Sequence, residues 1–404
     1  MPVDSGDTAF MLVSTALVML MTVGLAFFYG GLVRRKNILA IMMQSFAAFG
    51  VVTVVWVLVG YSFVFGEDRN GLLGSLQYAG LAGVGGAPHP RYGPTIPALV
   101  FMAFQMMFAI ITPALITGAF ADRMRFSRYL TFIAVWSLAV YVPLAHWIWG
   151  GGFLSQNGVI DFAGGYVVHM SAGFSALASV FIFRPRTISS GERVAPANVP
   201  YVALGAGLLW FGWFGFNAGS ALAAGALAAF AFVNTMLGGA VALLTWMVVN
   251  WWNDGKPSAT GALTGSIAGL AAITPASGFV APWAAVIIGI LAGAGCYAAT
   301  KFRARRKWDD SLDVWACHGI GGTIGVIATG AFADPSVNGQ AGLVYGGTGL
   351  FAVQVGAAVF VAAFCFAVTY AILRIMNRVS PIQVPAGAER SGLDLAEHGE
   401  AAYD

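Results

Sequence analysis

The sequence predicts an all-α protein that crosses a membrane many times, and three observations carry this prediction. Of the 404 residues, 58% are hydrophobic and only 9% are charged, whereas a soluble domain usually carries about 25% charged residues. The mean hydropathy is +0.78. Several stretches contain no Lys, Arg, Asp or Glu, and each exceeds the roughly 20 residues that a helix needs to span a bilayer; they cover residues 38–66, 92–121, 129–160, 194–253 and 257–300.

These stretches predict about eleven transmembrane helices, because the longer ones must hold two spans each or very oblique ones. Small residues three or four apart, as in GGAVALLTW and GILAGAG, favour close packing of helix backbones in lipid. The predicted helices lie near residues 8–31, 38–66, 96–120, 129–150, 162–184, 199–217, 225–252, 259–275, 281–301, 312–333 and 346–376.

The basic residues set the expected orientation of the chain. With the N-terminus outside, all but Arg69 and Arg91 of the 20 Lys and Arg residues, Arg193 included, fall in segments on the cytoplasmic side. Cytoplasmic loops of membrane proteins carry such an excess of Lys and Arg. An odd number of helices then places the C-terminus in the cytoplasm. We therefore expect a multi-pass protein of the inner (cytoplasmic) cell membrane, and the basic residues give no reason to expect a nucleic-acid partner.

The composition changes sharply after Met376, where the polar segment NRVSPIQVPAGAERSGLDLAEHGEAAYD begins. It contains two prolines and cannot span a bilayer. The sequence therefore predicts a transmembrane domain over residues 1–376 and a cytoplasmic tail over residues 377–404. Three cysteines lie within apolar spans without a paired spacing, and we interpret them as packing residues.

Two histidines stand out because each lies inside a long apolar stretch: His169 in DFAGGYVVHMSAG and His318 in DDSLDVWACHGIGG. An ionisable residue within a membrane span is a functional candidate by default. At 1.5 Å per residue, His169 lies about 12 Å along the fifth predicted helix from Asp161, which marks the outer edge of that helix. His318 lies about 10 Å along the tenth predicted helix from Ser311, which marks its inner edge. In a hydrocarbon core of about 30 Å, both rings arrive near the middle from opposite faces.

The residues alone leave three interpretations of this pair open. The histidines could be unrelated core residues bonded to nearby backbone, a metal or haem pair, or a polar stripe along a conduction path. Two neutral imidazoles can bond each other through one N–H and one lone pair. Gly173 and Gly322 each follow a histidine by four residues, a weak echo of the inverted repeats in which a substrate path lies near the midplane.

Other candidate site residues have an ordinary structural explanation beside the functional one. Asp161 could cap a helix, and an ionised carboxylate there would also favour a cation above it. Trp149 in AHWIWGGG fits an interfacial belt or a cation-binding face. Phe108 and Phe216 could be core residues or a gate, and Ser220 could bond a ligand.

No nucleotide-binding glycine loop, metal-ligand cluster or Ser/His/Asp arrangement stands out in the sequence. The sequence therefore predicts neither an enzyme nor a cofactor.

At these residues the chain resembles the ammonium transporter (Amt) family, as a bacterial-type member of the Amt/Rhesus superfamily. The resemblance covers nearly the whole chain, and its order and spacing are highly specific. The segments that carry it are AFFYGGLVRRKN, FQMMF, AHWIWGGG, DFAGGYVVHMSAG, FGWFGFNAGSA and DDSLDVWACHGIGG.

The resemblance implies eleven transmembrane helices in a five-plus-five inverted repeat, assembled as a homotrimer with one pore per subunit. It implies ammonium recruitment at Trp149, Phe108 and Ser220, a pore gate of Phe108 and Phe216, and a pore lined by His169 and His318. Asp161 takes the role of stabilising or deprotonating the ion. Trp149 and Ser220 fit the Amt branch better than the Rhesus branch.

The tail segment ERSGLDLAEHGEAAY resembles the cytoplasmic end of bacterial family members, which implies a PII-type signal protein as a partner at that face. The expected function is transport of ammonium or ammonia, with methylammonium as a further possible substrate. Ammonium is recruited at the outer site, loses a proton and passes as ammonia through an apolar pore. The alternatives are an ammonium sensor of the same fold with little flux, and a conduit for another small neutral solute.

Overall fold

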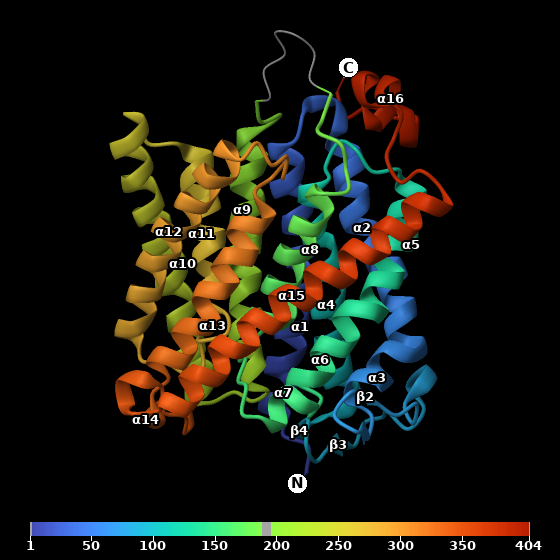
Figure 1. Ribbon diagram of the computed structural model, residues 1–404. Coiled ribbons are helices and arrows are strands. Elements are labelled where there is room, and N and C mark those ends of the chain that lie inside the picture. Colours follow the sequence, from blue (N-terminus) through green and yellow to red (C-terminus); the bar gives the residue numbers. More distant parts are fainter. Residues whose placement is uncertain (1, 188–194, 404) are drawn as a thin grey trace.

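The computed structural model of the chain describes residues 2–187 and 195–403, so that Arg193 lies outside the described residues. Within them, eight helices are long and apolar enough to cross a membrane, and Ala259–Ile273 is a shorter apolar helix. The two chain ends lie at opposite ends of the helical bundle (Figure 1). The prediction of an all-α, multi-pass membrane protein is confirmed.

The α-helices follow the predicted spans closely. In chain order they are α1 (Ser5–Leu32), α2 (Ile38–Val55), α3 (Tyr61–Phe65), α4 (Ala98–Ile116), α5 (Phe126–Trp136), α6 (Val142–Ile148), α7 (Phe153–Gln156), α8 (Ser171–Val180), α9 (Val199–Ala218), α10 (Ala226–Asp254), α11 (Ala259–Ile273), α12 (Pro282–Arg305), α13 (Gly321–Phe332), α14 (Pro335–Asn338), α15 (Thr348–Val379) and α16 (Ala386–Ser391).

Shorter segments extend or join these helices. The π-helical ones are η2 (Trp56–Gly60), η5 (Ser137–Tyr141), η6 (Gly165–Met170), η8 (Trp315–Ile320) and η10 (Asp394–His398). The 3-10 turns are η1 (Arg35–Asn37), η3 (Ala79–Leu81), η4 (Thr117–Ala119), η7 (Gly219–Ala221) and η9 (Leu343–Tyr345). Two small antiparallel hairpins, β1 (Asp68–Arg69) with β2 (Leu73–Gly74) and β3 (Pro88–His89) with β4 (Gly93–Pro97), lie in the Gly-rich loop before α4.

Glycines allow α1 and α9 to pack with their backbones in close contact. A Cβ atom on Gly205 would lie 2.2 Å from the backbone nitrogen of Phe28, and one on Gly31 would lie 2.6 Å from the carbonyl oxygen of Asn198. Neither backbone atom can move aside without displacing its helix. Small residues at such positions favour helix association in lipid, as the sequence predicted. α15 instead runs obliquely across the outside of the bundle (Figure 1).

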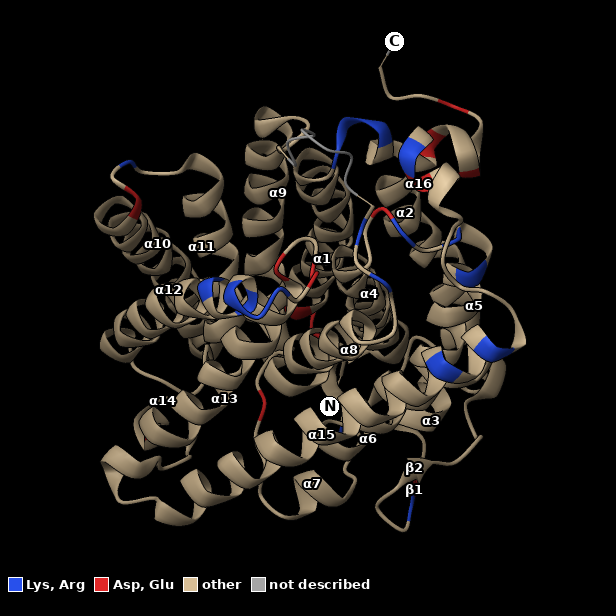
Figure 2. Cartoon of the chain, turned by 45° about the horizontal axis from the view of Figure 1, so that its top comes forward, with Lys and Arg blue, Asp and Glu red and all other residues tan. Residues whose placement is uncertain are grey.

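Most Lys and Arg residues gather at the end of the bundle that carries the C-terminus, whereas Arg69 lies on β1 (Figure 2). Several form ion pairs there: Arg123 Nη1 lies 3.3 Å and Arg186 Nη2 lies 2.8 Å from the carboxylate of Asp309. Burial alone would raise the pKa of Asp309, but the charges of Arg123 and Arg186 outweigh it and hold the pKa below its usual value. The carboxylate therefore stays ionised at neutral pH.

The tail is folded against this end of the bundle, and α15 ends at Val379 rather than at Met376. The carboxylate of Glu389, which is fully buried, lies 3.0 Å from Arg184 Nη1. Asp394 Oδ1 accepts a 2.8 Å hydrogen bond from the backbone N–H of Ala40, in the first turn of α2. Tail carboxylates thus bind partners in the loop after α8 and in the first turn of α2.

Candidate functional site

The two histidines meet in the middle of the bundle, as the sequence predicted. His169 lies in η6 and His318 in η8, and their Nδ1 atoms are 3.3 Å apart. The ring planes are 20° apart with centroids separated by 5.3 Å. The residues are 1% and 3% exposed, so both imidazoles lie in surroundings where a charge would be costly.

The neighbours of His169 define which ring nitrogen carries its proton. Thr274 Oγ1 donates to the carbonyl oxygen of Leu270 at 2.7 Å, which uses its only proton. It then accepts from Trp213 Nε1 at 2.9 Å and from His169 Nε2 at 3.3 Å. With its proton on Nε2, His169 offers the lone pair of Nδ1, and His318 Nδ1–H donates to it. The network thus assigns the tautomers of both neutral rings and leaves His318 Nε2 as an acceptor.

The carboxylate of Asp161 caps the first turn of the helical segment that carries His169, although the N-cap residue itself is Gly164 and not Asp161. Its carboxylate accepts hydrogen bonds from the backbone N–H groups of Gly164, Gly165 and Tyr166 at 2.7–2.8 Å. Gly164 has a φ of 122°, which favours glycine, and this turn lets the carboxylate face the start of η6. The fifth helical segment therefore begins at Gly165 and not at 162 as predicted, and it ends at Val180.

The segment that carries His318 is built in the same way. Asp310 accepts hydrogen bonds from the backbone N–H groups of Val314 and Trp315 at 3.1 and 2.8 Å, so this helical segment begins near Trp315 and not at 312. Asp310 precedes His318 by the same 8 residues that separate Asp161 from His169. Where the two segments cross, a Cβ on Gly173 would lie 2.0 Å from the backbone nitrogen of Gly319.

Two phenylalanine rings, tilted by 33° to each other, lie between the histidines and an outer cavity. The ring centroids of Phe108 and Phe216 are 4.2 Å apart, and Phe216 also stacks on His169 at 6.0 Å. The outer cavity has a volume of about 290 Å³ and is lined by Phe108, Trp149 and Ser220, among others. The inner cavity, lined by Phe216 and both histidines, has a free volume of only about 10 Å³, which is room for about one water.

Hydrogen bonds fix the polar groups of the outer cavity. The indole N–H of Trp149 donates to the carbonyl oxygen of Asp161 at 2.9 Å, and the Ser220 hydroxyl donates to the carbonyl oxygen of Phe216 at 2.8 Å. The ring face of Trp149 and the lone pairs of Ser220 Oγ are therefore the parts left to meet a ligand. Phe108 contacts Trp149 edge to face at 5.8 Å.

The structure adds residues that the sequence did not single out. Gln105 lines the outer cavity, and its Oε1 has no hydrogen-bond partner among the described residues. Arg91 lines the same cavity and brings a positive charge to it. The spacing shared by Asp161–His169 and Asp310–His318 could have drawn attention to Asp310, whereas Thr274 and Trp213 carried no such signal.

The fold and this path together define a polytopic membrane transport protein: a helical bundle with an outer cavity, a pair of rings and a narrow histidine-lined passage along one line. The model of the Ammonium Transporter Family matches residues 9–403. The chain therefore belongs to the ammonium transporter family, which is a family of transporters and not of enzymes.

Relatives and solved structures agree with this assignment over nearly the full length. The chain is 48% identical to an ammonium transporter of Bacillus subtilis, with 98% of each chain covered. It is 46% identical to ammonium transporter Amt1 of Archaeoglobus fulgidus, covering 99% of this chain and 100% of the relative. The crystal structure of Candida albicans Mep2 matches with a TM-score of 0.90 at 37% identity, covering 99% of this chain and 91% of that one.

Proposed function

We propose that this chain transports ammonium nitrogen across the cytoplasmic membrane by taking up ammonium at the outer cavity, removing a proton and passing ammonia between the twin histidines. The observation that carries this proposal is the bonded pair of His169 and His318 next to the contacting rings of Phe108 and Phe216. Neutral imidazoles in a dry passage can exchange single hydrogen bonds with a small neutral solute. They do not compensate the desolvation cost of an ion.

Recruitment is assigned to Trp149, Phe108 and Ser220. An ammonium ion over an aromatic ring gains about 0.5–2 kcal/mol, and the lone pairs of Ser220 and Gln105 Oε1 can accept its N–H groups. Asp161 contributes its negative charge from below the cavity. These contributions offset the repulsion that Arg91 introduces, and they favour a cation that can donate several hydrogen bonds.

The barrier to ions follows from the apolar gate of Phe108 and Phe216. Moving a bare ion into apolar surroundings costs on the order of tens of kcal/mol before compensation. Potassium and ammonium are both excluded on this ground, but only ammonium can leave a proton behind and continue as a neutral molecule. Asp161 is the carboxylate we assign to ion stabilisation or to accepting this proton.

We further propose eleven transmembrane crossings with the N-terminus outside, a five-plus-five inverted repeat, and a homotrimer with one pore per subunit. The matching Asp–His spacing in η6 and η8, which enter from opposite ends, supports the repeat. The transmembrane domain covers residues 1–376, and the tail, residues 377–404, regulates it. The folded tail and the basic loops beside it offer a surface to a PII-type signal protein.

Proteoliposome flux tests the proposal. We expect His169→Ala to lower ammonium-driven flux at least about tenfold, because loss of one hydrogen bond to a passing solute costs about 1 kcal/mol and the paired ring also loses its partner. His398→Ala, in η10 of the tail and not among the lining residues of either cavity, is the matched control and retains the wild-type flux. Unchanged flux and selectivity in His169→Ala would contradict the pore assignment, and current on an ammonium jump across a supported membrane would show that charge accompanies the nitrogen.

One observation favours a second candidate, an ammonium sensor with little flux. A solved sensor Amt protein matches this chain with a TM-score of 0.89 at 28% identity, covering 97% of this chain and 98% of that one. Expression in a strain that lacks other ammonium transporters separates the two functions. A transporter restores growth on low ammonium, whereas a sensor with little flux does not.

A further inference from the structure

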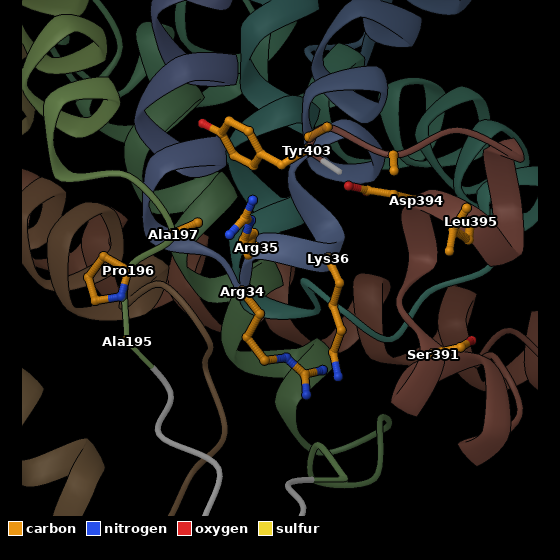
Figure 3. Close-up of a pocket in the computed structure, with 12 residues that line it drawn as sticks. Arg34, Arg35, Lys36, Ala195, Pro196, Ala197, Ser391, Asp394, Leu395 and Tyr403 are labelled. Carbon is orange, nitrogen blue, oxygen red and sulfur yellow. The ribbon is translucent and has the colours of Figure 1, made fainter.

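The cations of the loop after α1 are held by partners at the end of the bundle that carries the C-terminus. Arg34 Nε lies 2.9 Å from the carboxylate of Asp122, which is itself buried. Lys36 Nζ donates to a carbonyl oxygen of the tail at 2.7 Å, and Figure 3 shows Arg35 turned toward the ring of Tyr403. These charges belong to the contacts that hold the tail in place.

Arg91, between β3 and β4 at the end that carries the N-terminus, is in a different situation (Figure 1). Arg69 in the same loop lies 3.9 Å from the carboxylate of Glu67, but none of the ion pairs between described residues includes Arg91. Its side chain lines the outer cavity together with Trp149 and Ser220. A cavity to which we assign a cation therefore carries a positive group in its wall.

The guanidinium of Arg91 is placed beside the segment that follows Trp149. Its Cζ lies 5.3 Å from the ring centroid of Tyr92, and the Tyr92 hydroxyl donates to the carbonyl oxygen of Gly150 at 2.8 Å. A Cβ on Gly151 would lie 2.7 Å from the same Cζ atom, so a glycine leaves the room that the guanidinium fills. The charge therefore rests on the turn that begins at the recruiting tryptophan.

The titratable groups around Arg91 do not cancel its charge. His89 Nδ1 accepts the backbone N–H of Arg91 at 3.2 Å, and burial, together with the charge of Arg91, lowers the pKa of His89, which is therefore neutral at pH 7. Burial raises the pKa of Tyr92, which is neutral as well. The carboxylate of Asp68 is engaged elsewhere, because it lies 2.9 Å from His146 Nε2.

A fixed positive charge acts on an ammonium ion in the cavity in two ways. It weakens binding, because like charges repel. It also disfavours the charged, protonated form of the bound molecule relative to the neutral form. The second effect assists the step that the proposed pathway requires, since the ion must become ammonia before it passes His169 and His318.

We propose that Arg91 promotes the release of a proton from ammonium held at Trp149. One N–H bond of the ion breaks, and its electron pair stays on nitrogen as the lone pair of ammonia. The proton passes to Asp161, the acceptor assigned above, or to water in the outer cavity. The repulsion by Arg91 is relieved as the charge leaves the nitrogen, so Arg91 destabilises the bound ion more than the ammonia that follows. This inference rests on the proposed function and adds to it the group that makes the bound ion less stable.

Uptake by proteoliposomes, measured against ammonium concentration at pH 7, tests the proposal. We expect Arg91→Gln to lower both the half-saturating ammonium concentration and the maximal flux by about 2- to 10-fold, because unit charges at a partly solvated cavity wall interact by about that much. Arg91→Lys keeps the charge and should stay near the wild type. Arg69→Gln removes a cation of the same loop that is not among the lining residues of the cavity, and it is the matched control.

The pH and salt dependence of flux give readouts that a purely structural role would not change. At a fixed ammonium concentration, the external pH at which flux is half-maximal should be higher in Arg91→Gln, because the bound ion keeps its proton more tightly. An increase in ionic strength from about 0.1 to 1 M shortens the screening length from about 10 to 3 Å. It should move the wild type toward the values of Arg91→Gln and leave the variant nearly unchanged.

A lower half-saturating concentration with an unchanged maximal flux and pH profile would show that Arg91 only repels the substrate, and it would overturn the proposal. Equal values in Arg91→Gln and Arg69→Gln would overturn it as well. Absence of flux in the wild type would instead contradict the transport function, so the inference and the proposed function can fail separately.

Discussion

At the scale of single residues, the central feature of this protein is a chain of hydrogen bonds that ends at His318. Thr274 uses its proton on Leu270 and so must accept from His169, which fixes the order of donors and acceptors along the pair. The positions of the two rings alone would allow either histidine to donate the hydrogen bond to the other. The hydroxyl group of Thr274 makes one arrangement the more stable.

Thr274→Val removes this acceptor, and we expect a mixture of histidine tautomers and a flux about fivefold below the wild type, because one hydrogen bond contributes about 1 kcal/mol. The ¹⁵N chemical shifts of labelled histidines report the tautomers directly. Trp213→Phe removes the second donor to Thr274 but keeps the threonine hydroxyl, so it shows which of the two losses changes the histidines. Thr323→Val is the matched control. Unaltered histidine shifts in Thr274→Val would contradict the assignment.

Trp149→Leu tests the recruiting surface. Removal of a cation–π contact of about 0.5–2 kcal/mol predicts a half-saturating ammonium concentration about 2- to 30-fold higher. Uptake measured against ammonium concentration gives this value. Trp252→Leu, on a side chain 87% exposed at the end of α10, is the control, and an equal shift in both variants would rule out the recruiting role.

The sequence was informative about some residues and silent about others for a physical reason. His169, His318 and Asp161 stand out because an ionisable group in an apolar stretch is rare and costly. Thr274 and Gln105 are uncharged, and Thr274 lies 105 residues from the histidine that it bonds. Their roles depend on which helices face each other, and this cannot be inferred from a single sequence.

At the scale of helices, the π-helical segments η6 and η8 position the two rings. Both follow a carboxylate that accepts the first backbone N–H groups, and both continue directly into an α-helix. The sequence predicted the spans to within a few residues because apolar length and charged loops mark them. It did not predict the π-helical turns, since a single turn leaves no periodic pattern.

The crossing of α8, which continues η6, with η8 depends on Gly173. A Cβ there would meet the backbone of Gly319 at 2.0 Å, so Gly173→Ala must push the two segments apart. We expect a loss of unfolding free energy of about 1–3 kcal/mol or more, as for other overpacked cores, and lower flux. Thermal unfolding in detergent measures the first effect.

Gly207→Ala supplies the control for this change. No atom lies within 4 Å of the position that its Cβ would occupy, and alanine is the better helix former. This variant should be as stable as the wild type or slightly more stable. Equal stability of Gly173→Ala would show that the crossing tolerates a wider separation.

At the scale of the whole molecule, the end of the bundle that carries the C-terminus is held together by ion pairs among residues far apart in the sequence. Asp309 joins Arg123 and Arg186, and Glu389 of the tail joins Arg184. The sequence predicted that the basic residues face this side, and it predicted a separate polar tail. It did not predict that tail carboxylates are buried in the loops, because complementary charges alone do not specify partners.

Asp309→Asn leaves the buried guanidinium of Arg123 and the partly buried one of Arg186 without their shared carboxylate, and we expect it to cost about 3–5 kcal/mol. The pKa of Asp309 is lowered in the folded protein, so its contribution is complete above the unfolded value near 3.8 and is lost as the pH falls further. Unfolding measured from pH 7 to pH 3 should therefore show a difference between variant and wild type that shrinks only at the acidic end. Asp254→Asn, an exposed pair with Lys301, is the control.

The narrow cavity beside the histidines has a consequence for the energy supply of the cell. A bacterial membrane maintains a voltage, and each elementary charge that crosses 100 mV releases about 2.3 kcal/mol. A continuous column of water would let protons and alkali ions dissipate that store. The structure leaves a free volume of only about 10 Å³ next to His169 and His318, with the rings of Phe108 and Phe216 in contact beside it, and this is too small for such a column. We therefore expect the protein to supply nitrogen to the cell without discharging the membrane.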